Sequence, residues 1–286
     1  MTERVFQIGA GQVGRGLNRA FTDSGTQVIG LHGRRPTAAA TSYGPLPDTI
    51  TDANVIIVSV RDPQIDEVMG GILAAVQSGR LGPGTVVLHT SAVAEPKVLA
   101  DLAALGFPGG TFHPLMPFSD PQRAAAMLRG GWIGIDGDGT ARATARRLAA
   151  RIGARTLDIP AGKKPAYHAA AVMGSNFPVV LASVAGHLLQ ELGIPDTSAQ
   201  HAIEALMKGA LANIADHTPD EVLTGPIVRG DPVTVGKHMR ALRPYPSATA
   251  VYRSLSAAAI EIAERRGLNP EKIAALRATL ASAARG

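Results

Sequence analysis

The feature that most constrains the fold is a glycine-rich segment close to the start of the chain. Residues 4–8 (RVFQI) form an apolar, strand-like run, which leads through GAGQVG into a helical pattern, LNRAFTDSG. Gly9, Gly11 and Gly14 therefore have G-x-G-x-x-G spacing between a strand and a helix. The first glycine permits a tight turn, the second lets the backbone approach a pyrophosphate, and the third lets the helix pack on the strand. We therefore expect the βαβ unit of a dinucleotide-binding sheet, with a structural glycine turn as the alternative.

Strand-like and helical patterns alternate from this segment to about residue 160. Residues 53–60 (ANVIIVSV) are a nearly continuous apolar run, typical of a parallel strand that is buried on both faces. After about residue 163 no such run recurs, and alanine- and leucine-rich helical patterns dominate. We predict an α/β fold, with a doubly wound parallel Rossmann sheet over residues 1–162 and an all-helical C-terminal domain over residues 163–286.

The composition excludes several classes of function. The chain of 286 residues has no cysteine, which excludes disulfides, thiolate metal sites and a cysteine nucleophile, and fits a reducing compartment. The net charge of +5 comes from scattered basic residues and only 4% of residues are aromatic, a pattern that disfavours nucleic-acid binding. The eight histidines lack the spacing of metal ligands, so no metal site is expected.

Two segments bear on the location of the protein. The first residues, MTERVFQIGAG, enter a strand at once and lack the basic and apolar regions of a signal peptide. Residues 166–192 are almost apolar enough to span a membrane, but Asn176 and Pro178 interrupt them near the middle. We therefore expect a buried helix in a soluble, cytoplasmic protein without a membrane partner.

The end of the second predicted strand bears on the choice of cofactor. An acid there would bind the ribose 2′-hydroxyl of NAD, but the sequence reads VIGLHGRRPT. Arg34 and Arg35 stand where a 2′-phosphate would lie, and guanidinium groups bind phosphate through charge-assisted hydrogen bonds. NADP(H) is therefore the predicted cofactor, with Thr37 as a helper; arginines that point into water are the alternative. The residues expected to bind the cofactor are Gly9, Ala10, Gly11, Gln12, Val13, Gly14, Arg34, Arg35, Ser59, Val60, Arg61 and Ser91.

Polar residues also follow the later strands, and ligands of such sheets bind outside the carboxyl ends of the strands. Ser59 and Arg61 end one strand-like run, Ser91 ends the next, and His113 lies at the end of a third. Imidazole titrates near neutrality, as acid–base work on a carbonyl or imine requires, so His113 is a candidate; a structural histidine is the equal alternative. Ser91 would hold a substrate carboxylate or the nicotinamide amide, or would form a turn. His89 lies inside an apolar run, which favours a packed role.

The helix predicted after residue 166 carries polar residues on one side. His168 and Ser175 are seven residues apart and share a face, and Asn176 lies near that face. A helix that is apolar on most sides and polar on one fits the wall of a cleft between two domains, where ligands bind. A core helix whose polar groups are satisfied internally is the alternative.

These motifs support a family resemblance. VSVRDPQI and FHPLMPF resemble segments of the Rossmann domain in the 6-phosphogluconate and β-hydroxyacid dehydrogenase-like superfamily, which includes ketopantoate, pyrroline-5-carboxylate and prephenate dehydrogenases or reductases. YHAAAVMGSNF (167–177) and LTGPIVRGDPVTVGKHMRAL (223–242) closely resemble the domain of unknown function 2520. The resemblance covers nearly the whole chain and implies a Rossmann-like domain followed by a helical domain.

The superfamily resemblance also implies hydride transfer, a site between the domains and a homodimer formed through the helical domain. The His-Pro segment of prephenate dehydrogenases carries their catalytic histidine and maps onto His113. Superfamily members often use a Lys and an Asn on the first helix of the second domain; Asn176 matches in kind, but no lysine stands one turn before it. Lys164 at the helix start, His168 or His113 would then serve instead. The expected catalytic residues are His113, His168, Asn176 and Lys164.

The segment GPIVRGDPV has a local structural interpretation. Its Gly-Pro and Gly-Asp-Pro sequences are turn signals, and Asp231 is expected to cap the helix that begins at Pro232. Arg229, in the loop between them, either reaches an anionic substrate or pairs across a dimer interface.

The sequence therefore predicts an NADP(H)-dependent oxidoreductase that transfers hydride to or from a small carbonyl, imine or hydroxy compound, including compounds with a carboxylate. A non-catalytic NADP(H)-binding sensor or scaffold is the second hypothesis, because a fold does not fix a function. A deazaflavin-dependent NADP reductase, which would need a second cofactor pocket, is the third.

Overall fold

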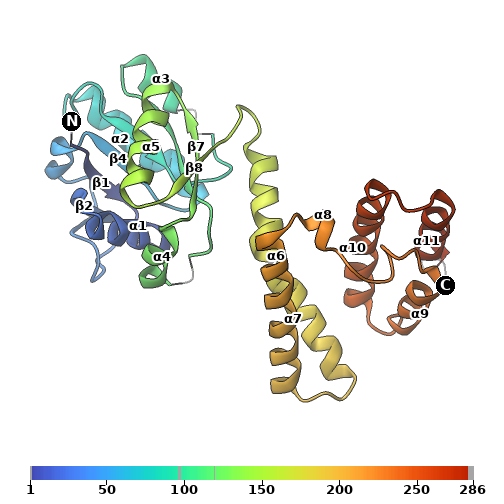
Figure 1. Cartoon of the computed structure of the whole chain (residues 1–286). Helices are drawn as coiled ribbons and strands as arrows, with labels where there is room; N and C mark the ends of the chain where they lie inside the picture. Colours follow the sequence, from blue (N-terminus) through green and yellow to red (C-terminus); the bar gives the residue numbers. More distant parts are fainter. Residues whose placement is uncertain (1, 96–97, 119, 283–286) are drawn as a thin grey trace. The chain divides into compact units, whose positions relative to one another are not determined.

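The computed structural model describes residues 2–95, 98–118 and 120–282, and Figure 1 shows the course of the chain. The contacts divide the chain into two units, Met1–Ser175 and Asn176–Gly286. This division falls inside a helix whose first turns belong to the first unit, whereas the composition changes at about residue 163.

The first unit is built on one sheet with the strand order β3-β2-β1-β4-β5-β6-β7-β8 among the residues described. Neighbouring strands are parallel except β6 and β7, which are antiparallel. β7 enters the sheet beside the end of β6, where Leu115 N–H donates to the Trp132 carbonyl. The Rossmann-like sheet is confirmed, with one antiparallel pair that the sequence pattern did not indicate. The strands are β1 (Arg4–Ile8), β2 (Gln27–Gly33), β3 (Ser42–Tyr43), β4 (Val55–Val58), β5 (Val86–His89), β6 (Gly109–Pro114), β7 (Trp132–Gly137) and β8 (Arg155–Asp158).

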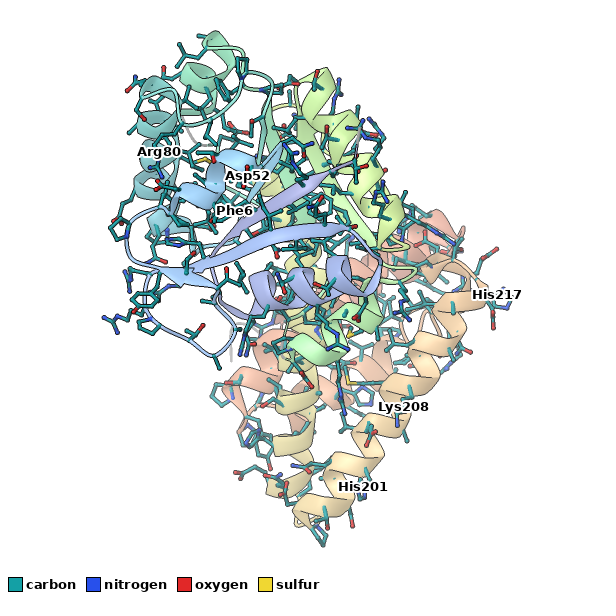
Figure 2. All side chains as sticks on the ribbon, turned by 90° about the vertical axis from the view of Figure 1, so that its left-hand side faces the viewer. Phe6, Asp52, Arg80, His201, Lys208 and His217 are labelled. Carbon is teal, nitrogen blue, oxygen red and sulfur yellow. The ribbon has the colours of Figure 1, made fainter. Side chains whose placement is uncertain are left out.

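Helices cover both faces of this sheet. Successive residues of a strand point to opposite faces, so neighbouring residues of one strand belong to different cores. Val5 and Leu88 belong to a core that includes residues of α1, α4 and α5. Phe6, labelled in Figure 2, and Val87 belong to a second core with residues of α2 and α3. The helices of this unit are α1 (Gln12–Asp23), α2 (Ile65–Gln77), α3 (Val98–Ala104), α4 (Pro121–Leu128) and α5 (Gly139–Arg151), with short 3-10 helices η1 (Asp48–Asp52) and η2 (Asp62–Gln64).

The sheet has a step at its carboxyl edge. β5 ends at His89 opposite Thr111, whereas β6 continues to Pro114 and is paired over its last residues with β7. In that antiparallel ladder His113 lies opposite Gly134. The strand β6 therefore carries His113 beyond the last residue of β5.

The second unit is all-helical, as predicted. α9, α10 and α11 share a core that includes Val235 and Met239. Asp231 caps α9 as expected, because its side chain accepts a hydrogen bond of 3.0 Å from the N–H of Thr234. The helices are α6 (Lys164–Glu191), which begins in the first unit, α7 (Asp196–Asp216), α8 (Pro219–Val222), α9 (Pro232–Ala241), α10 (Pro246–Arg265) and α11 (Pro270–Ser282).

The long helix α6 is far more exposed than the sequence predicted. Among the described residues it is the one helix that is long and apolar enough to cross a membrane, yet only 6% of its most apolar window is buried. Phe177 and Val179 on α6 are 53% and 70% exposed, and Leu206 on α7 is 69% exposed. The polar residues His201 and Lys208 also project from α7 (Figure 2). The prediction of a buried helix is therefore wrong for the single chain, because the chain itself leaves many of the apolar residues of α6 exposed.

Candidate functional site

Two glycines in the turn between β1 and α1 leave no room for a side chain. Gly9 has a φ of +114°, and a Cβ there would clash with the Ser59 carbonyl. A Cβ at Gly14 would clash with the carbonyl of Gly9, so α1 packs directly on the turn. A Cβ at Gly11 would meet no atom within 4 Å, and α1 begins after this residue without a side-chain cap. The first N–H groups of α1 are therefore left for a bound anion.

A pocket of about 450 Å³ lies against this turn. It is lined by the turn, by the residues that follow β2 and β4, and by Thr37, and it contains every predicted cofactor ligand except Val13, Gly14 and Ser91. A neighbouring pocket of about 200 Å³ shares Arg34 with it and extends to His32. Together the two pockets line the carboxyl ends of β1, β2 and β4.

Two arginines give the end of β2 its positive charge, and the histidine beside them is neutral. Arg34 and Arg35 are exposed and line the larger pocket, and neither guanidinium has an ion-pair partner among the described residues. His32 Nδ1 is 2.9 Å from the Ser42 hydroxyl, and its Nε2 is 3.0 Å from the carbonyl oxygen of Gly44. Burial lowers the pKa of His32, so the neutral ring donates from Nε2 to this carbonyl. The end of β2 therefore carries positive charge and no acid.

The three remaining predicted cofactor ligands have other surroundings. Val13 is partly buried and packs against the core, and Gly14 is buried beneath the turn. The hydroxyl of Ser91 accepts hydrogen bonds from the N–H groups of Val93, at 3.2 Å, and Ala94, at 2.9 Å. Ser91 thus stabilises the turn after β5, which was the alternative for this residue.

His113, Tyr167 and His168 form a cluster within the first unit. His113 Nδ1 is 2.8 Å from the Tyr167 hydroxyl, and the ring of His113 meets the rings of Tyr167 and His168 edge to face, with centroids 5.6 and 6.2 Å away. Tyr167 and His168 lie in the first turns of α6. Nδ1 of His168 is buried and has no hydrogen-bond partner among the described residues. The structure therefore brings together two of the predicted catalytic residues.

The surroundings of His113 keep its imidazole neutral. Burial, and then the neighbouring His168, lower the pKa of His113 to about 4, while Asp62 opposes them and Lys164 acts with them. Asp62 directly follows Arg61, which lines the larger pocket, so the cluster and the pocket share the segment after β4. At neutral pH His113 can therefore donate a hydrogen bond from one nitrogen and accept one at the other.

His89 and Lys164 are held inside the unit. His89 is fully buried with Nε2 3.4 Å from the Thr111 hydroxyl, in agreement with the packed role expected from the sequence. Lys164 is only 3% exposed; its ammonium donates to the carbonyl of Ala94 at 3.0 Å and lies 3.2 Å from a carboxylate oxygen of Asp136. These two contacts tie the start of α6 to β7 and to the turn after β5.

Sequence reasoning missed two residues of this cluster, Tyr167 and Gly134. A Cβ at Gly134 would clash with the hydroxyl of Tyr167, so the phenol occupies the space that this glycine leaves open. A tyrosine before a histidine gives no signal by itself, and only the antiparallel pairing of β6 with β7 places Gly134 opposite His113. The fourth predicted catalytic residue, Asn176, is exposed and is the first residue of the second unit.

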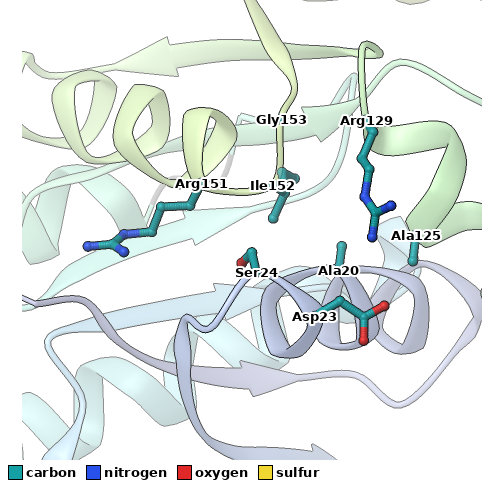
Figure 3. Close-up of a pocket in the computed structure, with 8 residues that line it drawn as sticks. All are labelled: Ala20, Asp23, Ser24, Ala125, Arg129, Arg151, Ile152 and Gly153. Carbon is teal, nitrogen blue, oxygen red and sulfur yellow. The ribbon is translucent and has the colours of Figure 1, made fainter.

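Figure 3 shows another pocket of the first unit, with a volume of about 310 Å³. Asp23 and Ser24, which line it, close α1 just before β2 begins, and Arg151 is paired with Glu3, which precedes β1. This pocket therefore lies near the amino ends of β1 and β2, away from the glycine turn. Ligands of doubly wound sheets bind at the carboxyl ends of the strands, so we assign no cofactor residue here.

Comparison with protein families matches both halves of the chain. Residues 3–114 match a Rossmann-like domain, and residues 132–259 match a domain of unknown function, DUF2520. No curated protein matches the sequence.

Solved structures share the fold over most of the chain. A protein from Thermotoga maritima is 25% identical, with a TM-score of 0.69, and the match covers 92% of this chain and 99% of that one. A candidate NADP oxidoreductase from Bacteroides fragilis is 21% identical, with a TM-score of 0.69, over 90% and 98%. A reductive aminase from Aspergillus terreus, solved with NADPH and ethyl levulinate, is 20% identical, with a TM-score of 0.60, over 96% and 98%.

Further structural neighbours are a pyrroline carboxylate reductase with NADP bound and an imine reductase in complex with NADP+. The fold is therefore the one that these NADP-dependent reductases have in common. The resemblance of YHAAAVMGSNF to the domain of unknown function 2520 is confirmed: the chain joins a Rossmann-like domain to a DUF2520 domain.

Proposed function

We propose that the chain is an NADP(H)-dependent oxidoreductase that transfers hydride to or from a small carbonyl, imine or hydroxy compound. The observation that carries this proposal is the pocket at the carboxyl ends of β1 and β4, where the glycine turn meets Arg34 and Arg35, whose guanidinium groups have no ion-pair partner in the described part of the chain. The fold shared with NADP-dependent reductases supports it.

The residues of this pocket fit a dinucleotide phosphate. The uncapped N–H groups at the start of α1 would bind the pyrophosphate, because a helix N-terminus attracts anions. Arg34 and Arg35 would bind the 2′-phosphate through charge-assisted hydrogen bonds. Ser59 and Arg61 line the pocket after β4 and would contact the nicotinamide end. NADPH, when bound, supplies the hydride.

The histidine cluster would act on the substrate. Neutral His113 would donate a hydrogen bond to the substrate atom that gains negative charge as hydride is added, which is where a fixed donor stabilises a transition state most. Lys164 is ion-paired with Asp136 and would position the start of α6 instead of exchanging a proton. His168 remains a second candidate for proton transfer, because its buried Nδ1 has no partner among the described residues.

Titration with NADPH and NADH, followed by nicotinamide fluorescence, tests the cofactor site. We expect the wild-type protein to prefer NADPH, and Arg34→Glu to weaken NADPH binding roughly 10- to 100-fold, since one charge-assisted hydrogen bond has about this value. Arg129→Glu is the matched control, because Arg129 lines the pocket at the opposite edge of the sheet. An unchanged preference in Arg34→Glu would contradict the role of this arginine.

The same complex is then tested against a panel of keto acids and cyclic imines. Oxidation of NADPH by one panel member would support a reductase. Tight binding without oxidation by any member would favour the alternative, a non-catalytic NADP(H) sensor or scaffold. Binding of neither nucleotide would contradict both functions.

We further propose that the chain forms a homodimer through α6 and α7. Support comes from the exposed apolar residues on these helices, among them Val179 at 70% and Leu206 at 69%, because monomers rarely leave such patches open. Lipid is a poor alternative cover, since Glu204 and Lys208 form an exposed ion pair on α7.

A further inference from the structure

Tyr167 and Gly134 lie next to the side chain of His113. His113 and Gly134 lie directly opposite each other in the antiparallel ladder of β6 and β7. Because Gly134 has no side chain, the phenol of Tyr167 reaches into the space above it, and its hydroxyl comes within 2.8 Å of His113 Nδ1. Three separate elements, β6, β7 and the first turns of α6, therefore fix a single hydrogen bond.

The direction of this hydrogen bond follows from the partners available. If the phenol donates, its proton is used and Nδ1 of the neutral ring accepts, which leaves the ring proton on Nε2. If Nδ1 donated instead, the phenol proton would have no acceptor among the described residues, because the one hydrogen bond of this hydroxyl is to His113. Burial also raises the pKa of Tyr167 to about 12, so the phenol keeps its proton at neutral pH.

We propose that Tyr167 is a positioning residue that holds His113 in the tautomer with its proton on Nε2. His113 then presents an N–H group to the site, and Nε2 has no hydrogen-bond partner among the described residues. A fixed N–H donor selects ligands with an acceptor atom, such as a carbonyl oxygen or an unprotonated imine nitrogen, over a protonated iminium. The selection of substrate rests on the proposed function; the tautomer does not.

The chain contains a matched control for this pair. In the second unit His238 Nδ1 is 2.8 Å from the hydroxyl of Tyr252, with ring centroids 5.6 Å apart and an interplanar angle of 87°. The corresponding values for His113 and Tyr167 are 2.8 Å, 5.6 Å and 84°. Tyr252→Phe therefore removes the same type of hydrogen bond without touching the cluster at His113.

The experiment is long-range ¹H–¹⁵N NMR of the full-length protein labelled at the histidine rings, near pH 7.5, with His113 assigned from the signals lost in His113→Gln. We expect wild-type His113 to show a protonated Nε2 and an unprotonated Nδ1. Tyr167→Phe should shift His113 toward a mixture of tautomers, whereas Tyr252→Phe should change His238 alone. Gly134→Ala should displace the hydroxyl of Tyr167 and give the same change as Tyr167→Phe, which provides a second variant if one of the two does not fold.

The outcomes separate the tautomer from the proposed function. Wild-type His113 protonated on Nδ1, or on both nitrogens, would overturn the proposal, and so would an unchanged His113 pattern in folded Tyr167→Phe. The expected tautomers without binding or oxidation of NADPH would leave the proposal standing and remove the proposed function. Where a substrate is found, Tyr167→Phe should lower kcat by up to about tenfold, the effect of one hydrogen bond, with the KM for NADPH unchanged.

Discussion

The two units of the chain differ in how completely they bury their own apolar residues. In the first unit, strand residues such as Val5 and Phe6 are covered on opposite faces by separate sets of helices. In the second unit, α9, α10 and α11 share a core, but α6 and α7 leave Val179 and Leu206 largely exposed. The sheet of the first unit is therefore covered by helices of its own chain, whereas the second unit leaves apolar residues of α6 and α7 exposed.

The largest expected effect is on that exposed surface. Val179→Asp should weaken the proposed homodimer more than about 100-fold, because a charge placed in an apolar interface costs several kcal/mol, roughly 3 or more. Val233→Asp is the control, since Val233 on α9 is 66% exposed and Val179 is 70% exposed. Light scattering after size-exclusion chromatography measures the mass. A monomeric wild-type protein, or a dimer unaffected by Val179→Asp, would remove the proposed interface.

A smaller effect is expected in the glycine turn of the first unit. Gly14→Ala should lower the free energy of unfolding by about 3 kcal/mol and abolish NADPH binding, because its Cβ would clash with the carbonyl of Gly9. Gly11→Ala should change stability by less than about 1 kcal/mol, since its Cβ meets no protein atom within 4 Å, and yet weaken NADPH binding. Urea unfolding and fluorescence titration measure the two quantities. Equal stability losses would show that this turn is less closely packed than the structure indicates.

The smallest expected effect is on how the free energy of unfolding depends on pH. Burial lowers the pKa of His89 to about 3, with smaller contributions from Lys164 and His113, whereas a histidine in the unfolded chain titrates near about 6.5. Between these values the unfolded chain binds the extra proton, so the free energy of unfolding falls as the pH falls. His89→Asn should therefore reduce the dependence of this free energy on pH, between about 6 and 4, by about one proton. Urea unfolding at a series of pH values measures the slope, and an unchanged slope would mean that His89 can be protonated in the folded protein.

The parts of the fold that could be predicted depend on short segments. The spacing of Gly9, Gly11 and Gly14 between a strand and a helix specifies a local turn, and the structure has that turn. The cap of α9 by Asp231 is equally local. The short helix α4 was not predicted, and neither was the reversed direction of β7 after it, because the direction of a strand depends on where a connection crosses the sheet.

The candidate site was predictable only residue by residue. His113 and His168 were expected because imidazole suits proton transfer, but their contact depends on the packing of α6 against the sheet. Tyr167 contacts His113 and Asp136 pairs with Lys164, both far away in the sequence, so only the structure shows these contacts. The exposure of α6 could not be predicted either, since hydropathy does not tell whether an apolar residue is buried by its own chain or by a partner. The cytoplasmic location stays a prediction.

The step between β5 and β6 has a consequence for redesign. Since β5 ends opposite Thr111, the last residues of β6 depend for their pairing on β7, and the chain continues from β5 as a loop at residues 90–95. Changes in this loop would leave the pairing of His113 with β7 unaltered. A change that displaces Ala94 would instead remove a contact of the start of α6, because the Ala94 carbonyl accepts a hydrogen bond from Lys164.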